Sequence, residues 1–151
     1  MIQRDYIERL IEQCADFLRR VLELRTAGQF EPALRVVHDA EHEVAGRLLP
    51  LLERLEAGSA VEVAGLADRE RVRLFASLVS EEAVIYWDLG DAASAYLCGR
   101  RALELFAALM LAGTPLDDAD RLRVAAASRI VDPTELKPEY AAAIRRLQAG
   151  A

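Results

Sequence analysis

The stretch from Ala83 to Phe106 constrains the fold more than any other part of the sequence. A helical spacing of apolar residues continues up to Leu89 and is then broken by Gly90, a residue type that commonly ends helices. Asp91 is a favoured helix N-cap residue, and a second helical pattern follows it directly. Two helices joined by so short a turn fold back on each other. The stretch therefore predicts an antiparallel helical hairpin.

Comparable patterns predict helices along the rest of the chain. In the first of them, apolar residues recur at intervals of 3 and 4 residues from Ile7 to Leu24, and Gly28 ends the pattern. Pro50 predicts a kink or break in the second helix, because a proline inside a helix removes a backbone hydrogen bond. The predicted helices cover about residues 3–27, 32–58, 59–65, 68–89, 92–112, 117–131 and 138–147. No segment has a convincing strand pattern, so we expect an all-α fold of six or seven helices arranged as antiparallel hairpins.

Length and charge limit the classes of function. The chain has 151 residues, the size of one domain, so we expect residues 1–151 to form a single all-helical domain that ends in helices within 117–149. It carries 19 basic and 25 acidic residues, for a net charge of −6, and positive charge gathers nowhere along it. Binding to a nucleic-acid backbone or to an anionic membrane needs clustered positive charge, so neither partner is predicted.

Neither export nor membrane insertion is indicated. Charged residues interrupt the N-terminal pattern from Arg4 onward, so a signal peptide is not predicted. The longest uncharged apolar run, from Leu105 to Leu116, is shorter than the roughly 20 residues that span a bilayer. Cys14 and Cys98 form no Cys-x-x-Cys motif and suit free thiols in a reducing compartment. We therefore expect a cytoplasmic protein.

Two turns of the chain share a pattern. One alanine lies 5 residues after each turn glycine and a second lies 12 residues after it, namely Ala33 and Ala40 after Gly28, and Ala95 and Ala102 after Gly90. Small residues at these places allow two antiparallel helices to approach closely. The unit resembles the tetratricopeptide repeat, a helix-turn-helix of about 34 residues, over residues 14–47 and 76–109. The opening residues are also similar to those of a family of short bacterial helical proteins of unknown function.

Resemblance to the tetratricopeptide repeat implies a protein-interaction module without enzymatic activity. Such modules commonly bind a partner helix or peptide on the concave face formed by the first helix of each pair. Counted from the turn glycines, the residues that the resemblance places on that face are Leu18, Leu22, Arg25, Ser80, Val84 and Trp87. Trp87 is the only tryptophan, and aromatic and arginine side chains are frequent interface anchors. The alternative is that Trp87 only covers neighbouring helices.

Two further binding functions fit the same features. Some secretion chaperones share this size, acidity and repeat type, so a small chaperone for a secreted protein is one alternative. Separately, the helix over 92–112 is apolar nearly all round in its second half, and it must be covered by the C-terminal helices or by another molecule. A homodimer through Leu105, Leu109 and Met110 is therefore the other alternative.

One short motif points to chemistry rather than to binding. His38-Asp39-Ala40-Glu41-His42 has the order His-x-x-Glu-His of inverzincin metallopeptidases, in which two histidines one helical turn apart bind zinc and the glutamate activates water. His38 and His42 are the only histidines, so a third ligand would have to be a carboxylate. A two-metal carboxylate centre is excluded, because it needs a Glu-x-x-His pair from each of two helices. We expect no catalytic residue, resident metal or cofactor, and the alternative is a zinc hydrolase through His38, Glu41 and His42.

Overall fold

The computed structural model describes residues 2–150, and the side chains of residues 4–150. Every regular element in that range is a helix, which confirms the all-α prediction. The helices are α1 (Ile2–Thr26), α2 (Phe30–Ala45), α3 (Leu49–Arg54), α4 (Ala57–Ala64), α5 (Arg69–Asp88), α6 (Ala92–Leu111), α7 (Asp118–Ile130) and α8 (Pro138–Gln148), with 3₁₀ turns at Gly46–Leu48, Leu66–Asp68 and Pro133–Glu135. The expected six or seven helices correspond to all of these α-helices except α3, which has only 6 residues. No helix within the described residues is both long enough and apolar enough to cross a membrane.

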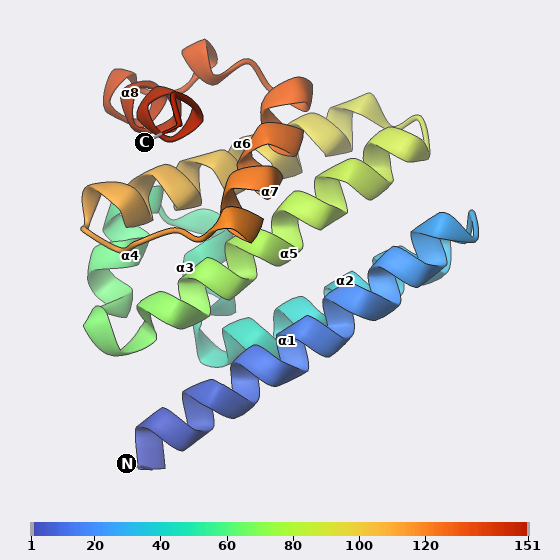
Figure 1. Cartoon of the computed structure of the whole chain (residues 1–151), viewed down its shortest axis with the longest axis horizontal. Coiled ribbons are helices and arrows are strands. Elements are labelled where there is room, and N and C mark those ends of the chain that lie inside the picture. Colours follow the sequence, from blue (N-terminus) through green and yellow to red (C-terminus); the bar gives the residue numbers. More distant parts are fainter. Residues whose placement is uncertain (1, 151) are drawn as a thin grey trace.

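Helix α5 is at the centre of the fold. It packs against α2 of the first hairpin and against α6 of its own hairpin, and it also contacts α1 and α7. In Figure 1 the α1–α2 hairpin lies along one side of α5, whereas α6 and the C-terminal helices lie along the other. The short helices α3 and α4 lead from α2 to α5, and α4 packs against α6. Residues on different faces of α5 therefore meet different helices.

The turns at Gly28 and Gly90 have the same geometry. Both glycines have a positive φ, +74° and +82°, which places them in the left-handed region that favours glycine. In each turn the residue after the glycine donates its N–H to a carbonyl of the preceding helix, from Gln29 to Leu24 at 2.8 Å and from Asp91 to Tyr86 at 2.9 Å. The alanines that follow the two glycines are all fully buried: Ala33, Ala40, Ala95 and Ala102. The close approach predicted for the two helices of each hairpin is confirmed.

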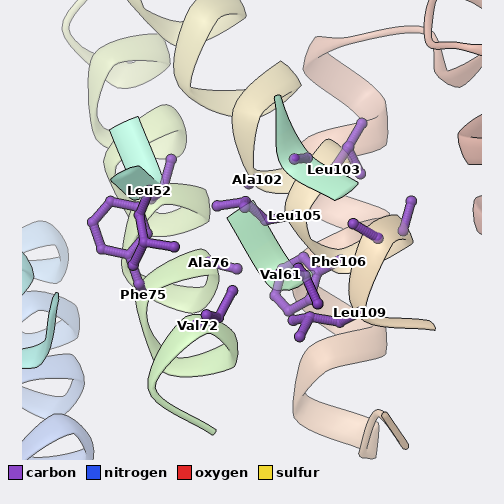
Figure 2. Close-up of a cluster of buried hydrophobic side chains, with 14 of the residues drawn as sticks. Leu52, Val61, Val72, Phe75, Ala76, Ala102, Leu103, Leu105, Phe106 and Leu109 are labelled. Carbon is purple, nitrogen blue, oxygen red and sulfur yellow. The ribbon is translucent and has the colours of Figure 1, made fainter. Parts of the chain in front are cut away.

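Helix α6 is buried by the chain itself. Figure 2 shows Leu105 and Leu109 of α6 together with Phe75 of α5 and Val61 of α4 in one hydrophobic core. Leu105 and Leu109 have no exposed surface, and Met110 is half-buried against the same core. The prediction that Leu105 and Leu109 offer a surface to a second copy is wrong, because α4, α5, α7 and α8 already cover this helix.

A buried ion pair fixes α7 on α5. Asp120, in the first turn of α7, is fully buried, and Arg73 of α5 donates to both of its carboxylate oxygens at 2.9 and 3.1 Å. Asp120 also accepts from the N–H of Asp117, whose side chain accepts from the Asp120 N–H at 2.8 Å. Both oxygens of the Asp120 carboxylate are therefore used, and α7 is held at a defined position across α5.

The start of α4 differs from the sequence prediction. This helix begins at Ala57 rather than at residue 59, because Glu56 and not Ser59 supplies the cap. The Glu56 carboxylate accepts hydrogen bonds from the N–H groups of Gly58 and Ser59 and from the hydroxyl of Tyr140 in α8. The bond from Tyr140 is the main cause that lowers the pKa of Glu56 to about 2. A cap that depends on α8 could not be found from local spacing.

Candidate functional site

Three of the six residues predicted for the binding face line an open groove between α1, α5 and α7. Arg25 comes from α1, and Val84 and Trp87 come from α5. Trp87 leaves 55% of its surface exposed, so it is not a core side chain. The remaining residues of the groove are Glu81 of α5 and, from α7, Ala119, Leu122, Arg123, Ala126, Arg129 and Ile130. These residues together are called the groove below.

The other three predicted residues lie outside the groove. Leu22 is exposed and is 3 residues before Arg25 on α1, so it extends the same helix face. Leu18 is half-buried and packs against the core. Ser80 is only 2% exposed, and its hydroxyl donates to the carbonyl of Ser77 at 2.7 Å. The placement of Ser80 on the binding face is wrong, because the central helix α5 turns this residue into the interior.

The residues of α7 that line the groove were not predicted from the sequence. Leu122, Ala126 and Ile130 are four residues apart along α7 and form one stripe, whereas Val124 and Ala127 face the core. Leu122 is 73% exposed. The signal that could have indicated this surface is a large apolar residue outside the core stripe of a predicted helix.

Arginines outnumber carboxylates in the groove. Glu81 is the one acidic side chain among the described residues that line it, and it lies between Arg25 Nη1 at 3.0 Å and Arg123 Nε at 3.6 Å. Arg25 Nε is 3.8 Å from Asp88 Oδ2. The Nε atoms of Arg25 and Arg123 are buried without a hydrogen-bond partner, and Arg129 adds a third, exposed guanidinium. The groove is therefore locally positive in an acidic protein.

A second group of polar side chains lies between α2 and α5. His38 and Glu41, three residues apart on α2, meet Glu82 of α5. His38 Nε2 lies 3.1 Å from Glu82 Oε2, and one ligand atom from each of the three residues lies within 4.8 Å of the other two. Glu41 and Glu82 are only 7% and 8% exposed, and His38 is half-buried. These three residues are called the α2–α5 cluster below.

The carboxylates of the α2–α5 cluster lack a strong cation. In the described part of the chain, His38 is the only basic side chain that pairs with Glu82, and none pairs with Glu41, whose Oε2 is buried without a hydrogen-bond partner. Burial, and after it the proximity of Glu82, raises the pKa of Glu41 far above its usual range. Burial, and after it the charge of Glu82, also raises the pKa of the thiol of Cys98 in α6. Carboxyl groups are thus gathered where solvent screens them little.

The His-x-x-Glu-His motif does not converge on one point. His38 reaches Glu82 across the helix interface, whereas the exposed His42 donates from Nδ1 to the carbonyl of His38 at 2.9 Å. The group that the fold brings together is His38, Glu41 and Glu82, rather than His38, Glu41 and His42. Spacing along one helix identified two members of this group, but the third comes from a helix that only the tertiary fold places beside it.

Comparison of the chain with known protein families, with curated proteins and with solved structures found no match. The geometry and charge of the groove and of the α2–α5 cluster are therefore the basis for a functional proposal.

Proposed function

We propose that the chain is a protein-interaction module that binds an acidic amphipathic helix or peptide in the groove between α1, α5 and α7. The observation that carries the proposal is the combination of exposed apolar side chains and excess arginine along one groove. Trp87 and Leu122 leave large apolar surfaces open to solvent on its two sides. An apolar centre with a charged rim is the usual composition of a protein-binding surface.

Trp87 is the main apolar anchor in this proposal. Val84 and Ile130 are half-buried beside it, so a side chain of the partner can rest on them while it covers the indole. Leu122 faces the same space from α7, and Leu22 lengthens the apolar surface along α1. Removing a central aromatic anchor typically costs about 2 kcal/mol or more of binding free energy.

The arginines of the groove indicate that the partner is acidic. Glu81 and Asp88 pair with Arg25 and Arg123, whereas the guanidinium of Arg129 is exposed to solvent. A carboxylate of the partner can accept hydrogen bonds from the exposed guanidinium of Arg129, and hydrogen bonds between charged groups are stronger than neutral ones. Because the whole protein carries a charge of −6, arginines at the groove also favour docking of an acidic partner there.

Selection from a random peptide library displayed on phage tests the proposal without a known partner. Binders to the wild-type protein are expected to combine one or more acidic residues with apolar residues at helical spacing. Each selected peptide is then synthesised, and its affinity is measured for Trp87→Ala and Leu122→Ala. Both variants are expected to bind at least about tenfold more weakly, which corresponds to roughly 1.4 kcal/mol.

Matched surface variants separate loss of the groove from general damage. Leu97 of α6 is 67% exposed and lies outside the groove, so Leu97→Ala is the control for Leu122→Ala. Arg47, which is highly exposed, provides the corresponding control for Arg25→Ala. Selected peptides that bind Trp87→Ala and Leu122→Ala as tightly as wild type would refute the proposal. So would peptides without acidic residues that are unaffected by Arg25→Ala.

A further inference from the structure

Helix packing places three side chains of metal-binding types at one point. His38 and Glu41 are three residues apart on α2 and so share a helix face, and Glu82 approaches from α5. Ligand atoms bound to one zinc ion at 2.0–2.2 Å lie roughly 3–4 Å from each other. The 3.1 Å separation of His38 Nε2 and Glu82 Oε2 is within that range, and the 4.8 Å limit for the whole group needs only small side-chain rotations.

Charge at this point is not balanced by the protein. Glu41 and Glu82 are more than nine-tenths buried, and Oε2 of Glu41 has no hydrogen-bond partner. A buried carboxylate is normally paired with a cation or bound to a metal, because leaving it alone is costly. The imidazole of His38 is the one basic group of the described residues that reaches either carboxylate. Two buried carboxyl groups beside a single imidazole therefore lack a cation that a divalent metal ion could supply.

Asp120, a buried carboxylate outside the α2–α5 cluster, shows how this protein can balance a buried negative charge by itself. Asp120 is fully buried, and Arg73 donates to both of its oxygens while the Asp117 N–H supplies another hydrogen bond. Among the side chains that the structure describes, no arginine reaches Glu41 in this way. The buried Asp120 is thus accompanied by an arginine, whereas Glu41 and Glu82 of the α2–α5 cluster are not.

We propose that His38, Glu41 and Glu82 bind one divalent first-row transition-metal ion, represented by Zn²⁺, between α2 and α5. One imidazole nitrogen with carboxylate oxygens suits such ions, whereas Ca²⁺ takes six to eight oxygen ligands. Three protein ligands leave one position of a tetrahedral ion for water or for another donor. The site differs from the His-x-x-Glu-His motif, because Glu82 takes the place of His42. The ion ties the first hairpin to α5 and neutralises the two carboxylates.

Calorimetric titration of Zn²⁺ into the full chain, purified without a histidine tag and stripped with a chelator, tests this site. One ion per chain is expected, together with a rise in the melting temperature, because a ligand that binds only the folded state stabilises it. Glu82→Gln and Glu41→Gln keep the size of the side chain and remove its charge, and each is expected to lower the affinity at least tenfold. Circular dichroism of both variants checks that they fold.

Two neighbouring residues provide matched controls. Glu81→Gln makes the same chemical change one residue earlier on α5, and His42→Ala removes the histidine that lies outside the cluster; both are expected to bind Zn²⁺ like the wild type. The proposal is overturned if no saturable binding is seen, or if Glu82→Gln binds as tightly as wild type. It is also overturned if His42→Ala abolishes binding, since that result would assign the metal to the surface motif.

Discussion

Glu81 and Glu82 are consecutive residues of α5, yet they have opposite electrostatic surroundings. Glu81 lies in the groove between two arginines, at 3.0 Å from Arg25 and 3.6 Å from Arg123. Glu82 lies in the α2–α5 cluster, next to the second buried carboxyl group of Glu41 and 3.1 Å from His38. Positive charge is therefore in excess on one face of this helix, and negative charge is in excess on another.

This difference suggests which kind of ligand suits each face. In the groove, arginine side chains remain after the only lining carboxylate has been paired, so an acidic partner completes the charge balance. In the α2–α5 cluster, carboxyl groups remain after the only imidazole has been paired, so a cation completes it. Asp120 shows the third case, in which the protein balances the charge itself through Arg73.

The largest loss of stability is expected when the buried ion pair between Arg73 and Asp120 is broken. Arg73→Met leaves the fully buried Asp120 without its cation, and breaking a buried pair in this way typically costs about 3–5 kcal/mol of unfolding free energy. Urea unfolding measures this loss. Arg47→Met, which removes an exposed guanidinium, is the control and is expected to change stability by less than about 0.5 kcal/mol. A loss at Arg73 no greater than at Arg47 would show that charge balance is unimportant for this core.

Changes of opposite sign are expected from the same substitution at Glu41 of the α2–α5 cluster and at Glu81 of the groove. Without metal, Glu41→Gln removes a buried carboxyl group that has no cation, and it is expected to stabilise the protein by about 1 kcal/mol. Glu81→Gln weakens ion pairs with two arginines, and it is expected to destabilise by about 0.5–1 kcal/mol. Urea unfolding in the presence of a chelator compares them. Destabilisation by both variants would contradict the proposed shortage of positive charge around Glu41.

A smaller effect is expected from salt, which should weaken peptide binding in the groove more than Zn²⁺ binding in the α2–α5 cluster. The groove is open, so its attraction for an acidic peptide is screened as the Debye length falls from about 10 Å at 0.1 M to about 3 Å at 1 M. The affinity of a selected peptide is expected to fall several-fold over this range. Buried charges are screened less, so the affinity for Zn²⁺ is expected to change less than that of the peptide. Peptide binding that is independent of salt would show that the arginines do not contribute.

The smallest effect concerns the reactivity of Cys98. Burial and the neighbouring Glu82 raise the pKa of this thiol, so at neutral pH little of it is the reactive thiolate. Glu82→Gln is expected to lower this pKa and to move the pH profile of alkylation to lower pH, whereas Glu81→Gln leaves it unchanged. Mass spectrometry separates Cys98 from Cys14, whose burial raises its pKa to about 11. Equal profiles for the two variants would contradict the effect of Glu82 on the thiol.

Local patterns predicted most of the fold. The turns at Gly28 and Gly90 and the buried alanines after them depend on residues close in sequence, so spacing alone was sufficient. The covering of Leu105 and Leu109 depends on helices far along the chain, so local spacing could not show that both side chains are buried within one chain. Helical periodicity shows which residues share a face but not which other helix will cover that face.

The same limit of helical periodicity explains which residues of the groove and of the α2–α5 cluster were predicted. Arg25, Val84 and Trp87 were predicted from the resemblance of the two hairpins, but the α7 side of the groove depends on the buried pair of Arg73 and Asp120. His38 and Glu41 stood out because they are close in sequence. Their partner Glu82 was not predicted, because an insert of two short helices separates α2 from α5 in the sequence.

Titration calorimetry with two ligands and two variants shows whether α5 contributes to two independent binding sites, one for an acidic peptide and one for a metal ion. Trp87→Ala is expected to lose the selected acidic peptide and to keep one Zn²⁺ per chain. Glu82→Gln is expected to keep the peptide and to lose Zn²⁺. If either variant lost both ligands, the two sites would not be independent. If both variants still bound both ligands, the two sites would not be where we propose.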